Sequence, residues 1–522
     1  MLEVEGLRAW ASGQQRLRGV SFPLAEYDSL AMLGASGSGK SLTARGILGL
    51  PPRGVRYDGT VLFQGQNLLA MPAKQLSALH GKALSMIFQE PSTALNPVMR
   101  IGDQIAEPLT IHTKLSNQEQ RRRVVELLDK TGLTAAGVGP KRFPHELSGG
   151  QRQRVAVAIA LALSPALVIA DEPTSALDAV SAAMVLDLLF ELAAEVGTAV
   201  IIITHDIDVA RRARQTLVLS EGNVAELGPT RSVLTAPKSE PAALLVAGAA
   251  LTLPSRERQA GKMVLSAERI TVARGGAHVV REASFAIRAG ERLALVGRSG
   301  SGKTSLSRAI VGLLPMSGRV TLSGKPVVPT SPVLRRAVQM VFQDPVTSFN
   351  PRHNIGQIVT EPLFGTQMAK KERLARADTL LAQVGLPGVL ERKPHEFSGG
   401  QRQRIAIARA LVASPRVLIA DEAVSALDAA LRAEVIALLD ELTRVEHIAL
   451  VFIAHDLSLV RHLADRVLVM DAGRIVEAGA TETVFARPQA SETKALLAAG
   501  DRHQRGSNGA LERGGHHYSV WS

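Results

Sequence analysis

Gly34-Ala-Ser-Gly-Ser-Gly-Lys40-Ser41 recurs as Gly297-Arg-Ser-Gly-Ser-Gly-Lys303-Thr304, so the chain carries two loops of the pattern G-x-x-x-x-G-K-[ST]. Each loop follows a short apolar run, at 29–33 and 293–296, and precedes a stretch that favours a helix. Glycines let successive backbone N–H groups converge on phosphate oxygens, and a helix N-terminus adds its positive dipole end. The sequence therefore predicts two nucleotide-binding units.

The expected phosphate contacts divide between backbone and side chains. The loop lysines place a charge on the β and γ phosphates, and the hydroxyl that follows each lysine is a ligand for Mg²⁺. The residues expected to bind ATP in these loops are Gly34, Ala35, Ser36, Gly37, Ser38, Gly39, Lys40 and Ser41 in the first copy, and Gly297, Arg298, Ser299, Gly300, Ser301, Gly302, Lys303 and Thr304 in the second.

The repeat divides the chain into two domains. The stretch from Val155 to Ala179 matches the stretch from Ile405 to Ala429, which lies 250 residues further on. Copies of this length are whole domains rather than solenoid units. We expect a first domain at 1–237, its tail and a linker at 238–262, a second domain at 263–490, and a C-terminal tail at 491–522 that is disordered from Asp501 onward.

Apolar β-rich runs alternate with helical patterns in each copy, as at 198–204 and 448–454. This alternation predicts an α/β fold with a mainly parallel sheet and a nucleotide at the carboxyl ends of its strands. The longest apolar stretch, 155–170, is broken by Ser164-Pro165 and indicates a buried helix followed by a buried strand. We do not expect it to span a membrane.

Composition excludes several classes of function. The 522 residues include no cysteine, so disulfides and thiolate metal sites are excluded and a reducing compartment is favoured. The segment from Met1 to Glu5 has neither a basic leader nor an apolar core, which indicates a cytoplasmic location. The net charge of +12 is scattered in small groups and aromatic residues make up only 3%, so no nucleic acid partner is expected.

A pair of acidic residues ends one buried apolar run in each copy, as Asp171-Glu172 and Asp421-Glu422. An ionised pair beside apolar residues needs a cation, and Mg²⁺ near the predicted phosphates meets that need. We assign Asp171 and Asp421 to the metal shell. Glu172 and Glu422 are then the general bases that polarise the attacking water.

Beside these motifs, Leu147-Ser-Gly-Gly-Gln151 and Phe397-Ser-Gly-Gly-Gln401 resemble the signature sequence of the ATP-binding cassette (ABC) ATPases. The resemblance covers nearly the whole chain. It implies two tandem P-loop NTPase domains that hydrolyse ATP, each with a mainly parallel sheet core and a helical subdomain. It also implies ATP and Mg²⁺ binding by Gln89 and Gln343, catalytic roles for His205 and His455, and a functional Ser-Ala-Leu-Asp segment at 175–178 and 425–428.

The signature has a physical sense of its own. Ser148 is a good N-cap, and Gly149-Gly150 leaves backbone N–H groups for a second anion site. The resemblance implies that this site meets the γ-phosphate across a head-to-tail sandwich of the two domains. The Lys40 loop would face Ser398, Gly399, Gly400 and Gln401, and the Lys303 loop would face Ser148, Gly149, Gly150 and Gln151. Because both copies lie on one chain, pairing within the chain is expected.

The stretches 88–97 and 342–351 resemble the extended glutamine loop of oligopeptide, dipeptide and nickel importer ATPases. The segments 237–245 and 488–497 resemble that group's C-terminal motif, although both lack its His-Pro-Tyr core. This resemblance implies two transmembrane permease subunits docked near Gln89 and Gln343, an extracytoplasmic solute-binding protein, and a peripheral location on the cytoplasmic face of the inner membrane. Peptides, glutathione, nickel and metallophores all stay open as the solute.

The two predicted sites differ. In this family an aromatic residue upstream of the loop stacks on adenine, and Trp10 holds that place in the first copy, whereas the equivalent position of the second is Ala273. Glu172-Pro-Thr174 becomes Glu422-Ala-Val424, so both glutamates are present. We therefore expect two hydrolytic sites of unequal nucleotide affinity.

Two rival functions fit the sequence less well. A twin-cassette ATPase that acts on ribosomes or DNA without membrane subunits usually carries a long charged helical linker or inserted metal modules. The short segment 238–262 and the absence of cysteine argue against both features. A catalytically inactive regulatory cassette conflicts with the presence of Glu172, Glu422, His205 and His455.

Overall fold

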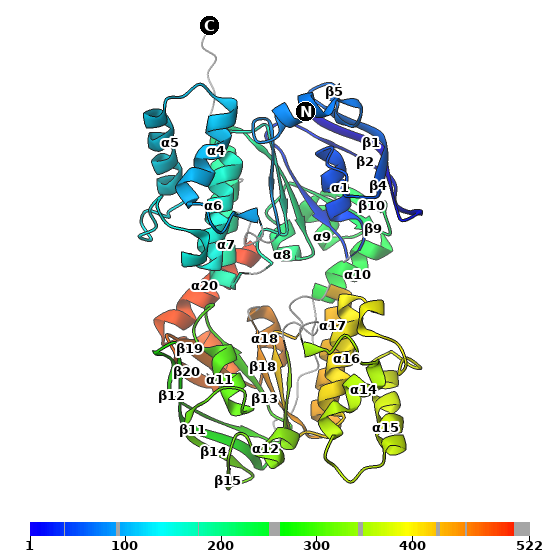
Figure 1. Ribbon diagram of the computed structural model, residues 1–522, viewed down its shortest axis with the longest axis vertical. Coiled ribbons are helices and arrows are strands. Elements are labelled where there is room, and N and C mark those ends of the chain that lie inside the picture. Colours follow the sequence, from blue (N-terminus) through cyan, green and yellow to red (C-terminus); the bar gives the residue numbers. More distant parts are fainter. Residues whose placement is uncertain are drawn as a thin grey trace. The chain divides into compact units, whose positions relative to one another are not determined.

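The computed structural model describes residues 1–35, 37–89, 94–175, 177–249, 261–342, 348–423, 429–454 and 457–505. They form two compact units, drawn mainly from Met1–Ala250 and Leu251–Gly500, with the same pattern of strands and helices (Figure 1). The predicted site residues Ser36, Gln343 and His455 lie outside the described residues, as do the linker at 250–260 and the segment 425–428.

An antiparallel sheet opens the first unit, with strand order β2-β1-β4-β5. Its strands are β1 (Leu2–Ala11), β2 (Gln14–Leu24), β4 (Val55–Phe63) and β5 (Gln66–Asn67). Buried and exposed residues alternate along β1 from Leu2 to Glu5, because successive side chains point to opposite faces of a strand. One face of this sheet is therefore committed to the core.

A second, mainly parallel sheet has the order β10-β9-β3-β8-β7-β6, and only its β9–β10 pair is antiparallel. Its strands are β3 (Ser29–Leu33), β6 (Leu84–Ile87), β7 (Leu167–Asp171), β8 (Ala199–Thr204), β9 (Gln215–Ser220) and β10 (Asn223–Pro229). Every residue of β7 and β8 is buried, as expected for strands covered on both faces. The buried strands predicted at the end of 155–170 and at 198–204 are thus confirmed as β7 and β8.

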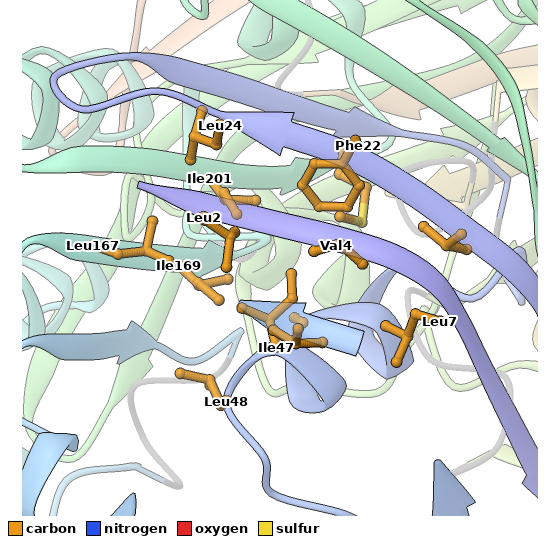
Figure 2. Close-up of a cluster of buried hydrophobic side chains, with 14 of the residues drawn as sticks. Leu2, Val4, Leu7, Phe22, Leu24, Ile47, Leu48, Leu167, Ile169 and Ile201 are labelled. Atoms are coloured by element: carbon orange, nitrogen blue, oxygen red, sulfur yellow. The ribbon is translucent and has the colours of Figure 1, made fainter. Parts of the chain in front are cut away.

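The two sheets share one core with helix α1 (Lys40–Ile47). Figure 2 shows Val4 of β1 and Phe22 of β2 gathered with Ile169 of β7, Ile201 of β8 and Ile47 of α1. These side chains are at most 3% exposed, so the cluster pins α1 between the sheets. This fixes the start of α1, where the phosphate loop ends.

A helical subdomain follows, with its own apolar cluster. It consists of α4 (Ile101–His112), α5 (Asn117–Lys130) and α6 (Gly149–Leu161), with the 3-10 turn η2 (Pro144–Glu146) before α6. Ser116 and Glu119 close a capping box that begins α5. The remaining helices of the unit are η1 (Leu68–Ala70), α2 (Ala73–Leu79), α7 (Ala179–Val196), α8 (Ile207–Ala210), α9 (Thr230–Thr235) and α10 (Glu240–Ala249).

The second unit repeats both sheets, in the orders β12-β11-β14-β15 and β16-β17-β18-β13-β19-β20. Its strands are β11 (Met263–Arg274), β12 (Ala277–Arg288), β13 (Arg292–Val296), β14 (Ser317–Leu322), β15 (Lys325–Val327), β16 (Val338–Val341), β17 (Val417–Asp421), β18 (Ala449–Ile453), β19 (Arg466–Asp471) and β20 (Arg474–Ala480). Its helices are α11 (Lys303–Ile310), α12 (Pro332–Ala337), α14 (Ile355–Thr360), η3 (Glu361–Leu363), α15 (Lys370–Gln383), η4 (Pro394–Glu396), α16 (Gly399–Leu411), α17 (Ala429–Val445), α18 (Leu457–Leu463), α19 (Thr481–Ala486) and α20 (Ser491–Arg505). The predicted fold class, two tandem α/β units with helical subdomains, is confirmed.

The tail of each unit is anchored by one glutamate of its last strand. Glu226 accepts hydrogen bonds from the N–H groups of Lys238 and Ser239, and Glu477 accepts them from Gln489 and Ala490. The helix α20 continues to Arg505, and the rest of the C-terminal tail, for which disorder is expected, lies outside the described residues.

Candidate functional site

Each glycine-rich loop connects a central strand to a buried helix start. Lys40 Nζ donates to the carbonyl oxygens of Gly34 at 2.7 Å and Ala35 at 2.9 Å. Lys303 Nζ makes the matching bonds to Gly297 at 2.7 Å and Arg298 at 2.8 Å. Both lysines are at most 6% exposed, so each ammonium group is held inside its loop rather than in solvent. The two loops therefore present the same fixed charge to a phosphate.

The turn between the last two strands of each mainly parallel sheet is hydrogen-bonded to the phosphate loop. The N–H of Gly222, between β9 and β10, donates to the carbonyl of Ser38 at 3.1 Å, and the carbonyl of Gly222 accepts from the N–H of Arg18 in β2 at 2.8 Å. Gly473 makes the same bridge between Ser301 and Arg281. Gly222 has φ +79°, and an added Cβ would lie 2.2 Å from a β2 carbonyl oxygen, so only glycine fits.

Sequence reasoning missed these two glycines. The available signal was a glycine between two apolar runs late in each copy, at Glu221-Gly222-Asn223 and Ala472-Gly473-Arg474, which is typical of a tight hairpin turn. Nothing local indicates that the turn contacts the phosphate loop, because their partners lie far away in the chain.

Two of the predicted metal ligands are brought together in each unit. Ser41 Oγ donates to Asp171 Oδ1 at 3.1 Å, and Thr304 Oγ1 donates to Asp421 Oδ1 at 3.1 Å. Burial is the largest influence on both carboxyl groups and raises the pKa of Asp171 and of Asp421, against the opposing hydroxyl hydrogen bonds. Asp421 Oδ2 is buried without a hydrogen-bond partner in the described residues. A hydroxyl and a buried carboxylate oxygen short of partners fit a hard divalent cation such as Mg²⁺.

The glutamate after each aspartate sits on an unusual backbone. Glu172 has φ +45° and Glu422 has φ +51°, in the left-handed region that non-glycine residues rarely adopt. The Glu172 N–H donates to Ile203 O at 2.9 Å and the Glu422 N–H to Ile453 O at 3.3 Å, so the neighbouring strand holds each residue in this strained conformation. Such strain is typical of functional sites.

The carboxylate of Glu172 is held at both oxygens. Gln89 Nε2 donates to Oε2 at 3.0 Å, and His205 Nδ1 lies 3.1 Å from Oε1. Burial alone would raise the pKa of Glu172, but the hydrogen bond and charge of His205, together with Lys40, outweigh it and lower the pKa. The carboxylate is therefore ionised at neutral pH and can accept a hydrogen bond from water. The structure thus brings together Gln89, Glu172 and His205, which are distant in sequence.

Both signature segments form the same cap. Ser148 Oγ accepts from the N–H of Gln151 at 3.3 Å, while Gln151 Oε1 accepts from the N–H of Ser148 at 2.9 Å. Ser398 and Gln401 make the same pair of bonds before α16. The predicted N-cap at Ser148 is confirmed, and Ser398 forms the same cap in the second unit. Ser148 and Gly149 are exposed at the surface, as are Ser398 and Gly399. The caps leave Gly149, Gly150, Gly399 and Gly400 in the first turns of α6 and α16.

Trp10 lies near the end of β1, paired with Arg56 of β4. The guanidinium carbon of Arg56 is 5.0 Å from the centre of the indole ring, which is a cation–π contact. Ala273 of β11 takes the matching place in the second unit and pairs with His278. The asymmetry expected from sequence is therefore present in the side chains, and its role in adenine binding stays a prediction.

The duplicated geometry agrees with a family model. The model described as ABC transporter matches residues 17–175 and 280–425, which include both phosphate loops, both signatures and both acidic pairs. The chain belongs to the ABC transporter family. The predicted family, the duplicated α/β fold and the ATPase activity of this ABC transporter chain are thereby confirmed, and ATP binding follows from them.

Full-length relatives support the same conclusion. This ABC transporter chain is 41% identical to the peptidoglycan transport ATP-binding protein YejF of Agrobacterium fabrum, over 92% of each chain. It is 40% identical to the glutathione import ATP-binding protein GsiA of Escherichia coli O157:H7, over 96% of this chain and 89% of the relative.

Two solved ATP-binding cassettes each match less than half of the chain. The structure of cbiO1 from Clostridium perfringens, part of the cbiONQ ABC transporter complex, is 30% identical, with a TM-score of 0.40, and covers 43% of this chain and 92% of its own. The ATP-binding cassette MJ0796 bound to ADP and Pi is 29% identical, also with a TM-score of 0.40, over 44% of this chain. In the described part of the ABC transporter chain, no helix is both long and apolar enough to cross a bilayer.

Proposed function

We propose that the chain is the ATP-hydrolysing subunit that energises import of peptides or related small solutes across the cytoplasmic membrane. The candidate solutes are dipeptides, oligopeptides, glutathione, nickel and metallophores. The glutathione import and peptidoglycan transport relatives support the peptide-like class, since they match nearly the whole chain. The extended glutamine loops at 88–97 and 342–351 support it independently.

One observation carries the hydrolytic part of the proposal: the Glu172 carboxylate is fixed between Gln89 and His205 beside the Lys40 loop. The two hydrogen bonds orient the carboxylate and leave it ionised, so that it can accept a proton or hydrogen bond from an attacking water. Lys40 supplies the charge that stabilises the phosphates. Glu422 takes the same backbone position in the second unit, where Gln343 and His455 are its proposed partners.

Mg²⁺ would be held by the hydroxyl and carboxylate pairs Ser41 with Asp171 and Thr304 with Asp421, together with Gln89 and Gln343. When bound, the ion neutralises charge on the β and γ phosphates. Burial raises the pKa of each aspartate, and the negative charge of the glutamate beside it raises the pKa further. The site is therefore electrostatically prepared for a cation.

The proposed assembly joins the two cassettes head to tail around two ATP molecules. The Lys40 loop faces the exposed signature at Ser398, and the Lys303 loop faces the one at Ser148. Two transmembrane permease subunits dock near Gln89 and Gln343, and an extracytoplasmic solute-binding protein delivers the solute. The chain is then peripheral, on the cytoplasmic face of the inner membrane.

The test is ATPase activity of the full chain with and without candidate permease subunits in lipid vesicles. We expect activity to rise with the permease subunits and to fall at least about 100-fold in the Glu172→Gln/Glu422→Gln double variant. Glu282→Gln is the matched control, since Glu282 is also a left-handed glutamate, at φ +52°, but its carboxylate is exposed and pairs with Arg269, away from the phosphate loops. Activity indifferent to the permease subunits, with the chain recovered on ribosomes, would overturn the proposal.

A further inference from the structure

Arg409 of the second unit is a buried cation, and the first unit has Ile159 at the same position of the repeat. Arg409 lies near the end of α16, the helix that begins at the second signature. Its Nη1 donates to the carbonyl oxygen of Ser348 at 2.9 Å, and its Nη2 donates to Ser348 Oγ at 3.1 Å. One guanidinium group thus holds both the backbone and the side chain of the same residue.

Two further neighbours complete the environment of Arg409. The guanidinium carbon lies 5.2 Å from the centre of the Phe349 ring, and Nη1 lies 3.8 Å from Glu361 Oε2 of η3. The side chain is only 11% exposed, and this burial lowers the pKa of the guanidinium despite the nearby carboxylate. A buried charge is stable only when its hydrogen bonds are made, so loss of the contact with Ser348 would be energetically costly.

Ser348 and Phe349 are the first described residues after the segment that contains Gln343. Arg409 therefore ties the end of the second glutamine loop to the helix that carries the second signature. In the first unit Ala94, Leu95 and Ile159 stand at the positions of Ser348, Phe349 and Arg409. Leu95 belongs to an apolar cluster, and Ile159 packs against it. Apolar packing is non-directional, whereas a two-point hydrogen bond to one residue fixes position and angle.

We propose that Arg409 is a positioning residue that couples the segment 348–351, the described end of the second glutamine loop, to the second signature helix. The inference rests on the proposed function, in which that loop serves the permease and the signature serves ATP. A displacement of Ser348 is then transmitted to α16 through two hydrogen bonds, at a place where the described part of the first unit has the apolar contacts of Leu95 and Ile159. The two cassettes then transmit ATP binding to the membrane subunits unequally.

The test is amide hydrogen exchange of the full chain with and without Mg·ATP, followed in peptides covering 348–354 and 94–100. Arg409→Ile installs the residue that the first unit already has at this position. We expect amides of 348–354 to exchange about tenfold faster in this variant, as for the loss of one net hydrogen bond, and to lose their response to Mg·ATP. Arg409→Lys keeps the charge but not the two-point geometry, so its effect is expected to be intermediate.

Arg404→Ile is the matched control on the same helix, because Arg404 contacts Val384 and Glu434 rather than the loop. It should leave exchange at 348–354 unchanged, and neither variant should alter the 94–100 peptide. Equal exchange in Arg409→Ile and wild type, or acceleration spread evenly over 355–411, would overturn the proposal. The exchange comparison without nucleotide does not depend on permease subunits, so its failure is distinct from failure of the import assay.

Discussion

Replacing Gly222 by alanine tests whether the β9–β10 turn supports the first phosphate loop. The turn joins Ser38 to Arg18 through two backbone hydrogen bonds of 3.1 and 2.8 Å. An alanine Cβ at 222 would lie 2.2 Å from the carbonyl oxygen of Arg16, so the turn must move away from β2. Gly65 is the matched control, because its φ of +80° is almost that of Gly222, at +79°, and nothing lies within 4 Å of its Cβ position.

The expected magnitudes follow from these contacts. The left-handed backbone costs an alanine about 1 kcal/mol at either position. At Gly222 alone, displacement of the turn also weakens two backbone hydrogen bonds, each worth about 1 kcal/mol net. Gly222→Ala should therefore lower the free energy of unfolding by about 3 kcal/mol, against about 1 kcal/mol for Gly65→Ala. Since the loop needs the turn in place, ATP affinity at the first site should fall by about 30-fold in Gly222→Ala only.

The assay is equilibrium titration with ATP in a Lys303→Ala background, which leaves the first site as the one measured, together with urea unfolding of the same variants. Gly473→Ala, assayed in a Lys40→Ala background, should reproduce the loss at the second site, because Gly473 bridges Ser301 and Arg281 in the same way. The reasoning is refuted if Gly222→Ala binds ATP as tightly as Gly65→Ala. The turn would then be a structural hairpin without influence on the loop.

Three more predictions concern single side chains. Arg292 is buried between Asp440, at 2.7 Å, and Asp465, at 2.8 Å. Arg292→Met should therefore lower the free energy of unfolding of the second unit by about 3–5 kcal/mol in urea, and a loss below about 1 kcal/mol would contradict this. Burial raises the pKa of Tyr57 from 10.0 to about 12. The contribution of the Tyr57 hydroxyl to the free energy of unfolding is therefore complete below pH 10 and lost as the pH rises through 12. In an ultraviolet titration Tyr57→Phe should remove the tyrosine ionisation at the highest pH, and an unchanged profile would exclude this assignment. Trp10→Ala should weaken ATP binding at the first site by about 1–3 kcal/mol while the second site is disabled, and unchanged affinity would show that the indole does not hold adenine.

The fold was predictable wherever the rules are local. The apolar runs at 198–204 and 448–454 have no polar face, which is the pattern of strands buried on both sides, and they are β8 and β18. Ser148 and Ser398, each followed by glycine and then glutamine, satisfy the capping-box pattern at both signature helices. In these places the sequence and the structure obey the same short-range constraint.

The site was predictable only in part, because its remaining determinants are long-range. The order of Gln89, Glu172 and His205 along the chain, read through a family resemblance, anticipated that they act together, but no spacing rule places them around one carboxylate. The clamp by Gly222 joins segments whose contact is set by sheet order. Arg409 and Ile159 occupy the same position of the repeat, where one substitution looks like ordinary variation between the two copies. The difference gains meaning only from the hydrogen bond of Arg409 to Ser348, which the sequence does not reveal.

The left-handed backbone of Glu172 and Glu422 has a practical consequence for engineering. At φ +45° and +51° the backbone of a glycine would be about 1 kcal/mol more stable than that of a glutamate. At Glu172 the same change would also remove the carboxylate that accepts hydrogen bonds from Gln89 and His205, each worth about 1 kcal/mol net. Because these two effects oppose each other, the melting temperature does not report the loss of the base. Directed evolution of this chain for heat tolerance therefore needs a growth or uptake screen in every round.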